Sequence, residues 1–166
     1  MKAWGHLACA AVAALFLNAP AHAQEAKPAP AAQASEELPK DAVGQGRVWR
    51  GKRDYFMVHL NRKFGELVVL MEAIEPRNGH IIADLKAQQE GWLAYYPREC
   101  WLTGTLTMAV GTWPSTYAMK CEAHQVDRRF RALSDAVACI QRAAPDKRSI
   151  EAPKCLVQLA PLTLQN

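Results

Sequence analysis

The chain has 166 residues, of which 50% are hydrophobic and 22% are charged. Its 20 basic and 16 acidic residues are spread along the sequence and give a net charge of +4. This charge is too small and too dispersed for the clustered basic surface of a nucleic-acid-binding domain, so no nucleic-acid partner is expected. A chain of this length usually builds one hydrophobic core.

The first 23 residues have the three parts of an export signal. Lys2 provides the positive start, residues 7–17 are an apolar run, and residues 21–23 (Ala-His-Ala) form a small-x-small cleavage site. The apolar run is shorter than the about 20 residues that a membrane-spanning helix needs. We therefore expect a signal peptide at residues 1–23 and a periplasmic or secreted protein. The mature chain would carry 19 basic and 16 acidic residues, a net charge of +3, and no membrane span.

Residues 24–50 are expected to form a disordered, Ala/Pro-rich linker. As far as Gly46 this segment has almost no large apolar side chain, so it cannot bury enough surface to offset its ordering entropy. Residues 48–50 (Val-Trp-Arg) could pack on the domain or remain loose, and the sequence does not decide between the two.

Three helices are expected between residues 51 and 143. Asp54 is a plausible N-cap for the first helix. Pro97 should kink or end the second helix because it removes one backbone donor. Residues 102–112 contain two glycines and four threonines, which favours a loop. The third helix should run from about residue 115 to about residue 142.

Each expected helix has one mainly apolar face, because its residues recur at steps of three and four. The first set is Phe56, Leu60, Phe64, Leu67, Met71 and Ile74, the second is Ile81, Leu85, Gln88, Trp92 and Tyr95, and the third is Met119, Ala123, Val126, Phe130, Leu133, Val137 and Ile140. Short connections join antiparallel helices, so the chain is expected to be all-α, a small antiparallel three-helix bundle with an irregular tail at residues 144–166.

Four cysteines remain after cleavage, an even number that favours two disulfides in an exported protein. Cys121 and Cys139 lie 18 residues apart on one helix. That spacing is about 27 Å, whereas the Cα atoms of a disulfide lie within about 7 Å. Cys100 precedes the loop that leads to Cys121, so it cannot reach Cys139. The remaining pairing is Cys100–Cys121 and Cys139–Cys155, and the second bond would strap the tail to the third helix.

The sequence carries no motif of a catalytic or metal centre. A zinc site of Cys100, Cys121 and His124 would need thiolates that stay reduced, which an oxidising compartment disfavours. The histidines of the mature chain, His59, His80 and His124, are isolated in sequence. No nucleophile, zinc-protease or phosphate-loop motif accompanies them. We expect no enzyme activity, no cofactor and no metal.

Several motifs carry a family resemblance. In chain order they are Leu60-Asn61 with Phe64, then Gln89, Trp92, Tyr95 and Cys100, then Gly111-Thr112 and Ser115, and finally Cys121, Arg128 or Arg129, and Leu133. Together they resemble the lysozyme inhibitor LprI-like N-terminal domain family over about residues 55–140. Members of that family commonly carry Arg-Asp after the aromatic residue of the second helix, where this chain has Tyr96-Pro97.

The resemblance implies an exported protein that binds a protein partner, lysozyme or another peptidoglycan hydrolase, by stoichiometric inhibition. A charge of +3 has the wrong sign for attraction to a strongly basic animal lysozyme, although an acidic patch at Glu72 and Glu75 could compensate. The alternatives are an immunity or envelope-stress interaction protein without lysozyme inhibition and, less favoured, an envelope enzyme.

Aromatic side chains dominate binding hot spots, so the aromatic residues around the predicted loop are candidates for partner contact. The candidate partner-binding residues are Tyr96, Trp101, Trp113 and Arg128. Local packing around the disulfide would equally explain the aromatic residues, and a solvated helix face would explain the arginine.

Overall fold

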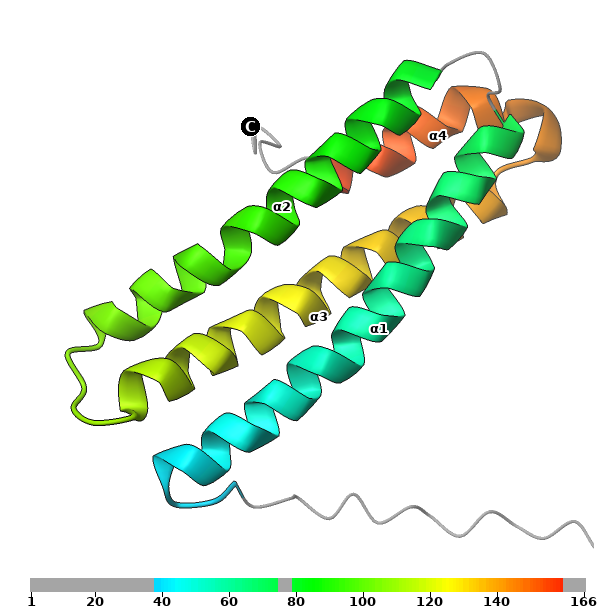
Figure 1. Ribbon diagram of the computed structural model, residues 1–166. Coiled ribbons are helices and arrows are strands. Elements are labelled where there is room, and N and C mark those ends of the chain that lie inside the picture. Colours follow the sequence, from blue (N-terminus) through cyan, green and yellow to red (C-terminus); the bar gives the residue numbers. More distant parts are fainter. Residues whose placement is uncertain (1–37, 75–78, 160–166) are drawn as a thin grey trace, which may run out of the picture. The chain divides into compact units, whose positions relative to one another are not determined.

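The computed structural model describes residues 38–74 and 79–159, and these residues are almost entirely helical (Figure 1). The helices are α1 (Ala42–Ile74), α2 (Gly79–Leu106), α3 (Trp113–Arg142) and α4 (Arg148–Leu156), with 3-10 turns η1 (Pro145–Lys147) and η2 (Val157–Leu159). Both predicted disulfides are present, so the all-α, crosslinked bundle is confirmed. The expected signal peptide and most of the linker lie outside the described residues.

The first helix begins at Ala42, and the prediction of a start at Asp54 was wrong. Asp41 is the residue that caps it, because its Oδ1 atom accepts a hydrogen bond of 2.7 Å from the backbone N–H of Gly44. Thr116 of α3 donates a hydrogen bond of 2.8 Å to the carbonyl of Ala42. The last part of the expected linker, residues 42–50, therefore belongs to the bundle, and Trp49 packs within it against His124.

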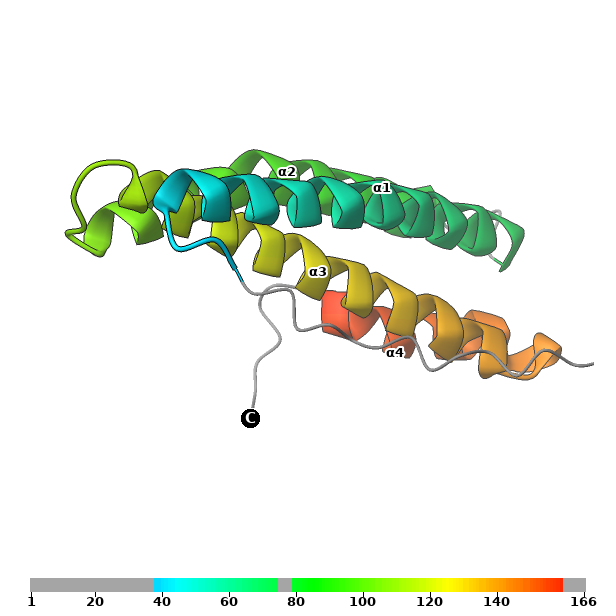
Figure 2. The same cartoon turned by 90° about the horizontal axis from the view of Figure 1, so that it is seen from below.

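The helices are arranged around α3, which packs against α1, α2 and α4. Contacts between Ala42 and Thr116 at one end, and between Glu66 and Gln141 at the other, show that α1 and α3 run in the same direction. The second helix, α2, runs antiparallel to both (Figure 1). Figure 2 shows α3 lying between α1 and α2 on one side and α4 on the other.

The core lies along the predicted apolar faces of α1 and α3. Its most deeply buried large side chains are Leu60, Leu67, Met71, Val126, Leu133, Val137 and Ile140. On α2 the prediction that Tyr95 belongs to the apolar face was wrong. Tyr95 is 64% exposed, whereas its neighbour Tyr96 is 7% exposed and faces the core. The reason is Cys100, which must face Cys121 and thereby brings Tyr96, one turn earlier, to the inside.

The second helix continues through Pro97 to Leu106, so it does not end at Pro97, and only residues 107–112 of the expected loop connect α2 to α3. Pro97 removes the N–H that would bond the carbonyl of Leu93, so α2 continues with one backbone hydrogen bond fewer. Met108 and Gly111 adopt positive φ angles of 55° and 66° and reverse the chain in the turn.

The tail expected to be irregular forms η1, α4 and η2. The Cys139–Cys155 bond, with Cα atoms 5.7 Å apart, holds it against α3. Ala152, Cys155 and Leu159 are buried, at a spacing of three and four that fits one helix face. The tail thus supplies a fourth element that completes the core. Residues 160–166 lie outside the described residues.

Gly104 determines how closely α2 and α3 approach each other. A Cβ atom at this position would overlap with the carbonyl oxygen of Pro114 and come within 3.2 Å of the Cβ atom of Ala118. We expect Gly104→Ala to lower the free energy of unfolding by about 1–3 kcal/mol, measured by urea denaturation. Gly91→Ala on the same helix is the matched control, because a Cβ atom there meets nothing within 4 Å. It should raise stability by up to about 1 kcal/mol, and equal effects of both variants would contradict the close packing.

Candidate functional site

The segment that leads from the end of α2 into α3 carries no charged side chain. From Cys100 to Met119 the chain has 20 consecutive residues without a single Asp, Glu, Lys, Arg or His. This stretch contains the last turns of α2, the connection at 107–112 and the first turns of α3. A surface segment of this length without charge is unusual in a protein whose residues are 22% charged.

Large apolar side chains in this stretch point to solvent. They are Trp101 (59% exposed), Leu102 (57%), Leu106 (69%), Met108 (86%), Val110 (81%) and Tyr117 (38%). We call the segment Trp101–Tyr117 the apolar tip. Single exposed apolar residues are common, but six within one short segment indicate an interaction surface. The tip is therefore the best candidate for a functional site in the described part of the chain.

The four predicted contact residues divide between the tip and other places. Trp101 and Trp113 both belong to the tip, where Trp101 is exposed and Trp113 is half-buried, with its ring 5.8 Å from that of Tyr117. Tyr96 was wrongly predicted to be exposed. It is buried and stacks on Trp92 at 4.5 Å, and its burial raises the pKa of its phenol. Arg128 is exposed on α3, about 22 Å from Trp113 at 1.5 Å per residue, so it lies away from the tip.

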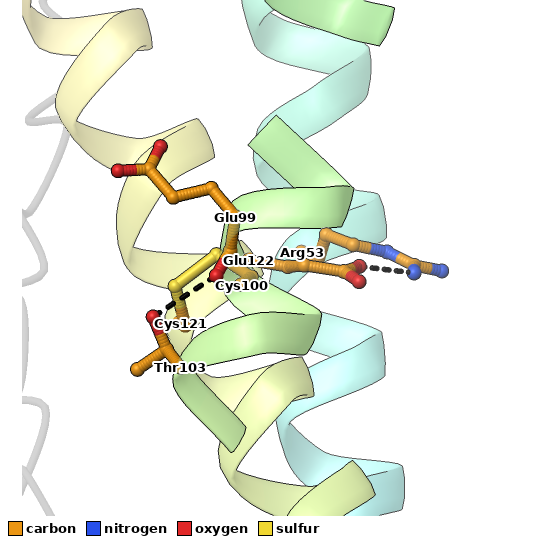
Figure 3. The surroundings of a disulfide bond; sticks show 6 residues. All are labelled: Arg53, Glu99, Cys100, Thr103, Cys121 and Glu122. Atoms are coloured by element: carbon orange, nitrogen blue, oxygen red, sulfur yellow. Dashed lines mark hydrogen bonds and ion pairs between the residues drawn. A yellow bond between two sulfur atoms is a disulfide. The ribbon is translucent and has the colours of Figure 1, made fainter. Parts of the chain in front are cut away.

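The apolar tip is held firmly at its base. The Cys100–Cys121 disulfide joins α2 to α3 with Cα atoms 5.3 Å apart, and Cys100 is fully buried (Figure 3). In the turn, the Thr107 hydroxyl donates a hydrogen bond of 2.7 Å to the carbonyl of Gly104. These contacts fix the exposed side chains on a preformed support, which lowers the entropy lost on binding.

An ion pair joins α1 to the same base. Arg53 donates to Glu122 at 2.8 Å (Figure 3) and to Asp54 at 2.7 Å, and Glu122 is buried. The hydrogen bond to Glu122 is the main cause that raises the pKa of Arg53. The pair ties the first half of α1 to α3 next to the disulfide, so all three long helices meet at this level.

Arg129 is the buried one of the two arginines that the family resemblance left open. Its guanidinium donates to the Gln89 side-chain oxygen at 3.1 Å, to the Leu159 carbonyl at 3.0 Å and to the Gln88 side-chain oxygen. It lies 5.8 Å from the ring centre of Trp92, and desolvation lowers its pKa. No carboxylate lies within 4 Å of it among residues 38–74 and 79–159. Arg129 therefore anchors the tail to α2 and α3 through neutral acceptors.

The other end of the bundle has a small apolar groove of about 220 Å³, open to solvent. It is lined by Ile81, Asp84, Leu85, Gln88, Leu156 and Leu159. The groove holds one acidic side chain and no nucleophile or histidine. Within the described residues, no group of three or more His, Cys, Asp or Glu side chains could hold a metal ion. His59 and His124 do not converge, because each packs against aromatic rings, Tyr55 and Phe130 for His59 and Trp49 for His124.

None of the helices in the described part of the chain is long and apolar enough to cross a membrane. Comparisons of the chain with protein-family models, with curated proteins and with solved structures found no match. The proposed function therefore rests on the geometry of the apolar tip.

The Arg129 anchor predicts a sharp difference between two neighbouring arginines. Arg129→Met leaves the side-chain oxygens of Gln88 and Gln89 without their donor and leaves the Leu159 carbonyl with the side-chain amide of Gln88 as its donor, so it should lower the free energy of unfolding by at least about 2 kcal/mol. Arg128→Met, on the exposed side, should change it by less than about 0.5 kcal/mol. Denaturant titration of both variants checks this, and similar stabilities would show that the tail does not depend on Arg129.

Proposed function

We propose that this protein is an exported, non-catalytic binding protein that docks on a protein partner through its apolar tip. The observation that carries the proposal is the run of 20 uncharged residues whose large apolar side chains are held exposed on a crosslinked support. An interface core of this kind, depleted of charge and rich in Trp and Met, is typical of protein–protein contacts. Two disulfides support export, because such bonds form and persist in oxidising compartments.

The partner we propose is a peptidoglycan hydrolase such as lysozyme, in the periplasm or outside the cell, and the resemblance to the LprI-like family supports it. The tip has the form that such a target requires, because a short turn at 107–112 between two helices projects from the end of the bundle (Figure 1). A projecting apolar turn can enter a substrate cleft and block it. Inhibition would then be stoichiometric, without turnover and without a cofactor.

The first experiment replaces Trp101 and Trp113 by alanine and measures inhibition of peptidoglycan lysis. Loss of aromatic hot-spot residues typically costs about 2 kcal/mol or more, so the inhibition constant should rise at least about thirtyfold. Far-ultraviolet circular dichroism should stay unchanged, because Trp101 is 59% exposed and Trp113 lies at the surface.

The matched control replaces Tyr55 and Tyr95, two aromatic residues that are 61% and 64% exposed but lie below the tip, Tyr95 about 9 Å along α2 from Trp101 and Tyr55 about 20 Å along α1 from Ala42. This variant should inhibit as well as the unaltered protein. If the tryptophan variant inhibits fully, the tip is not the contact surface. Tip-dependent binding to lipid vesicles, with no hydrolase bound, would replace the protein partner by a membrane surface.

A further inference from the structure

A set of basic side chains surrounds the base of the apolar tip. Arg98 lies two residues before Cys100 on α2, and Lys120 lies one residue before Cys121 on α3. Arg47 lies five residues after Ala42, whose carbonyl bonds Thr116, and Thr116 in turn lies five residues before Cys121. One cation from each long helix therefore lies near the level of the disulfide. We call Arg47, Arg98 and Lys120 the basic collar.

The collar is exposed and its charges are not neutralised within the described residues. None of its three members forms an ion pair there within 4 Å, whereas Arg53 at the same level is paired with Asp54 and Glu122. Lys120 contacts only the ring of Trp49, at 5.6 Å, among the aromatic rings described. The collar lies about 10 Å behind the end of the helices, since Lys120 follows Trp113 by seven residues.

Acidic side chains at this end do not outweigh the basic ones. Residues 38–54 and 98–122 contain seven basic and four acidic residues, a net charge of +3. Of the acidic residues, Asp41 caps α1, Asp54 and Glu122 pair with Arg53, and Glu99 is exposed. The tip is therefore apolar in its centre and positive around its base.

The acidic patch expected at Glu72 and Glu75 does not offset the positive charge around the tip. Glu72 lies in the last turn of α1, at the far end of the bundle, and faces Lys86 at 3.8 Å. Glu75 lies outside the described residues. An approaching basic lysozyme would therefore meet positive charge around the tip.

We propose that the hydrolase bound by the tip is one with an acidic cleft rim and a net negative charge, and that strongly basic animal lysozymes are poor partners. This inference rests on the proposed function. Glycoside hydrolases place two carboxyl groups beside the bond that they cleave, so their clefts offer negative charge. A positive collar steers the tip toward such a cleft and repels a positively charged rim. Charge around the tip thus selects among enzymes that cleave the same polymer.

The test compares association rates with a net-negative wall hydrolase and with a strongly basic lysozyme, at low and high salt. The collar variant is Arg47→Glu, Arg98→Glu and Lys120→Glu, with a milder variant carrying Gln at the same positions. The matched control is Arg62→Glu, Lys86→Glu and Arg142→Glu, which changes one exposed cation on each long helix in the far half of the bundle. Both Glu variants have the same net charge.

We expect the collar variant to associate about tenfold more slowly with the acidic enzyme at low salt, with the difference mostly lost in 0.5 M NaCl. The same variant should bind the basic lysozyme faster than the unaltered protein does, and the control should change neither rate by more than about twofold.

Equal effects of collar and control variants would overturn the inference in favour of overall charge, and so would a preference of the unaltered protein for the basic enzyme. Collar-dependent binding to phosphatidylglycerol vesicles alone would overturn it in favour of a lipid surface. If neither enzyme binds and the tryptophan variant behaves like the unaltered protein, the proposed function itself fails.

Discussion

The crosslink between Cys100 and Cys121 sets the rotation of α2 about its axis, and the functional surface follows from that rotation. With Cys100 directed inward, Tyr96 enters the core and Tyr95 turns to solvent. One residue after Cys100, Trp101 is carried outward onto the tip. The bond closes a segment with a sequence separation of 21, which corresponds to about 3 kcal/mol in the chain-entropy model. The disulfide therefore fixes the orientation of α2 about its axis, and this orientation decides which aromatic side chains are exposed to a partner.

A second, separate set of contacts stabilises the opposite half of the bundle. The Cys139–Cys155 bond and the Arg129 hydrogen bonds both hold the tail, one to α3 and the other to α2 and α3 together. A bundle of this size has a marginal core, so a fourth element that buries Ala152, Cys155 and Leu159 matters. The exposed side chains of the tip lie outside this set of contacts, whereas Gly104 and Thr116 of the same segment pack against α3 and α1.

Much of the architecture was predictable because helical periodicity and cysteine geometry are strong signals. The apolar faces of α1 and α3 and both disulfides were predicted correctly. The start of α1 was predicted wrongly because the hydrogen bond between Thr116 and Ala42 joins residues 74 positions apart and is not visible in the sequence. The end of α2 was predicted wrongly because the packing of Cys100 and Gly104 on α3, beyond Pro97, cannot be read from the chain.

The tip was predictable in part, and the collar was not. Trp101 and Trp113 were identified because they flank a cysteine and a turn, and the uncharged run that contains them is visible in the sequence. Tyr96 was misassigned by one position, since a neighbouring pair of tyrosines gives no signal of which one faces the core. The collar depends on the alignment of Arg47 with Lys120, and Arg47 falls in a segment that looks like a linker until the packing of α1 on α3 is known.

The central claim is that a partner binds at the apolar tip. Hydrogen–deuterium exchange of the intact protein, with and without a saturating net-negative wall hydrolase, tests it most directly. Slower exchange is expected at the backbone amides of residues 101–117, with little change in α4 and around the groove lined by Ile81 and Leu156. Protection confined to α4 and that groove, with the tip exchanging as in the free protein, would contradict it.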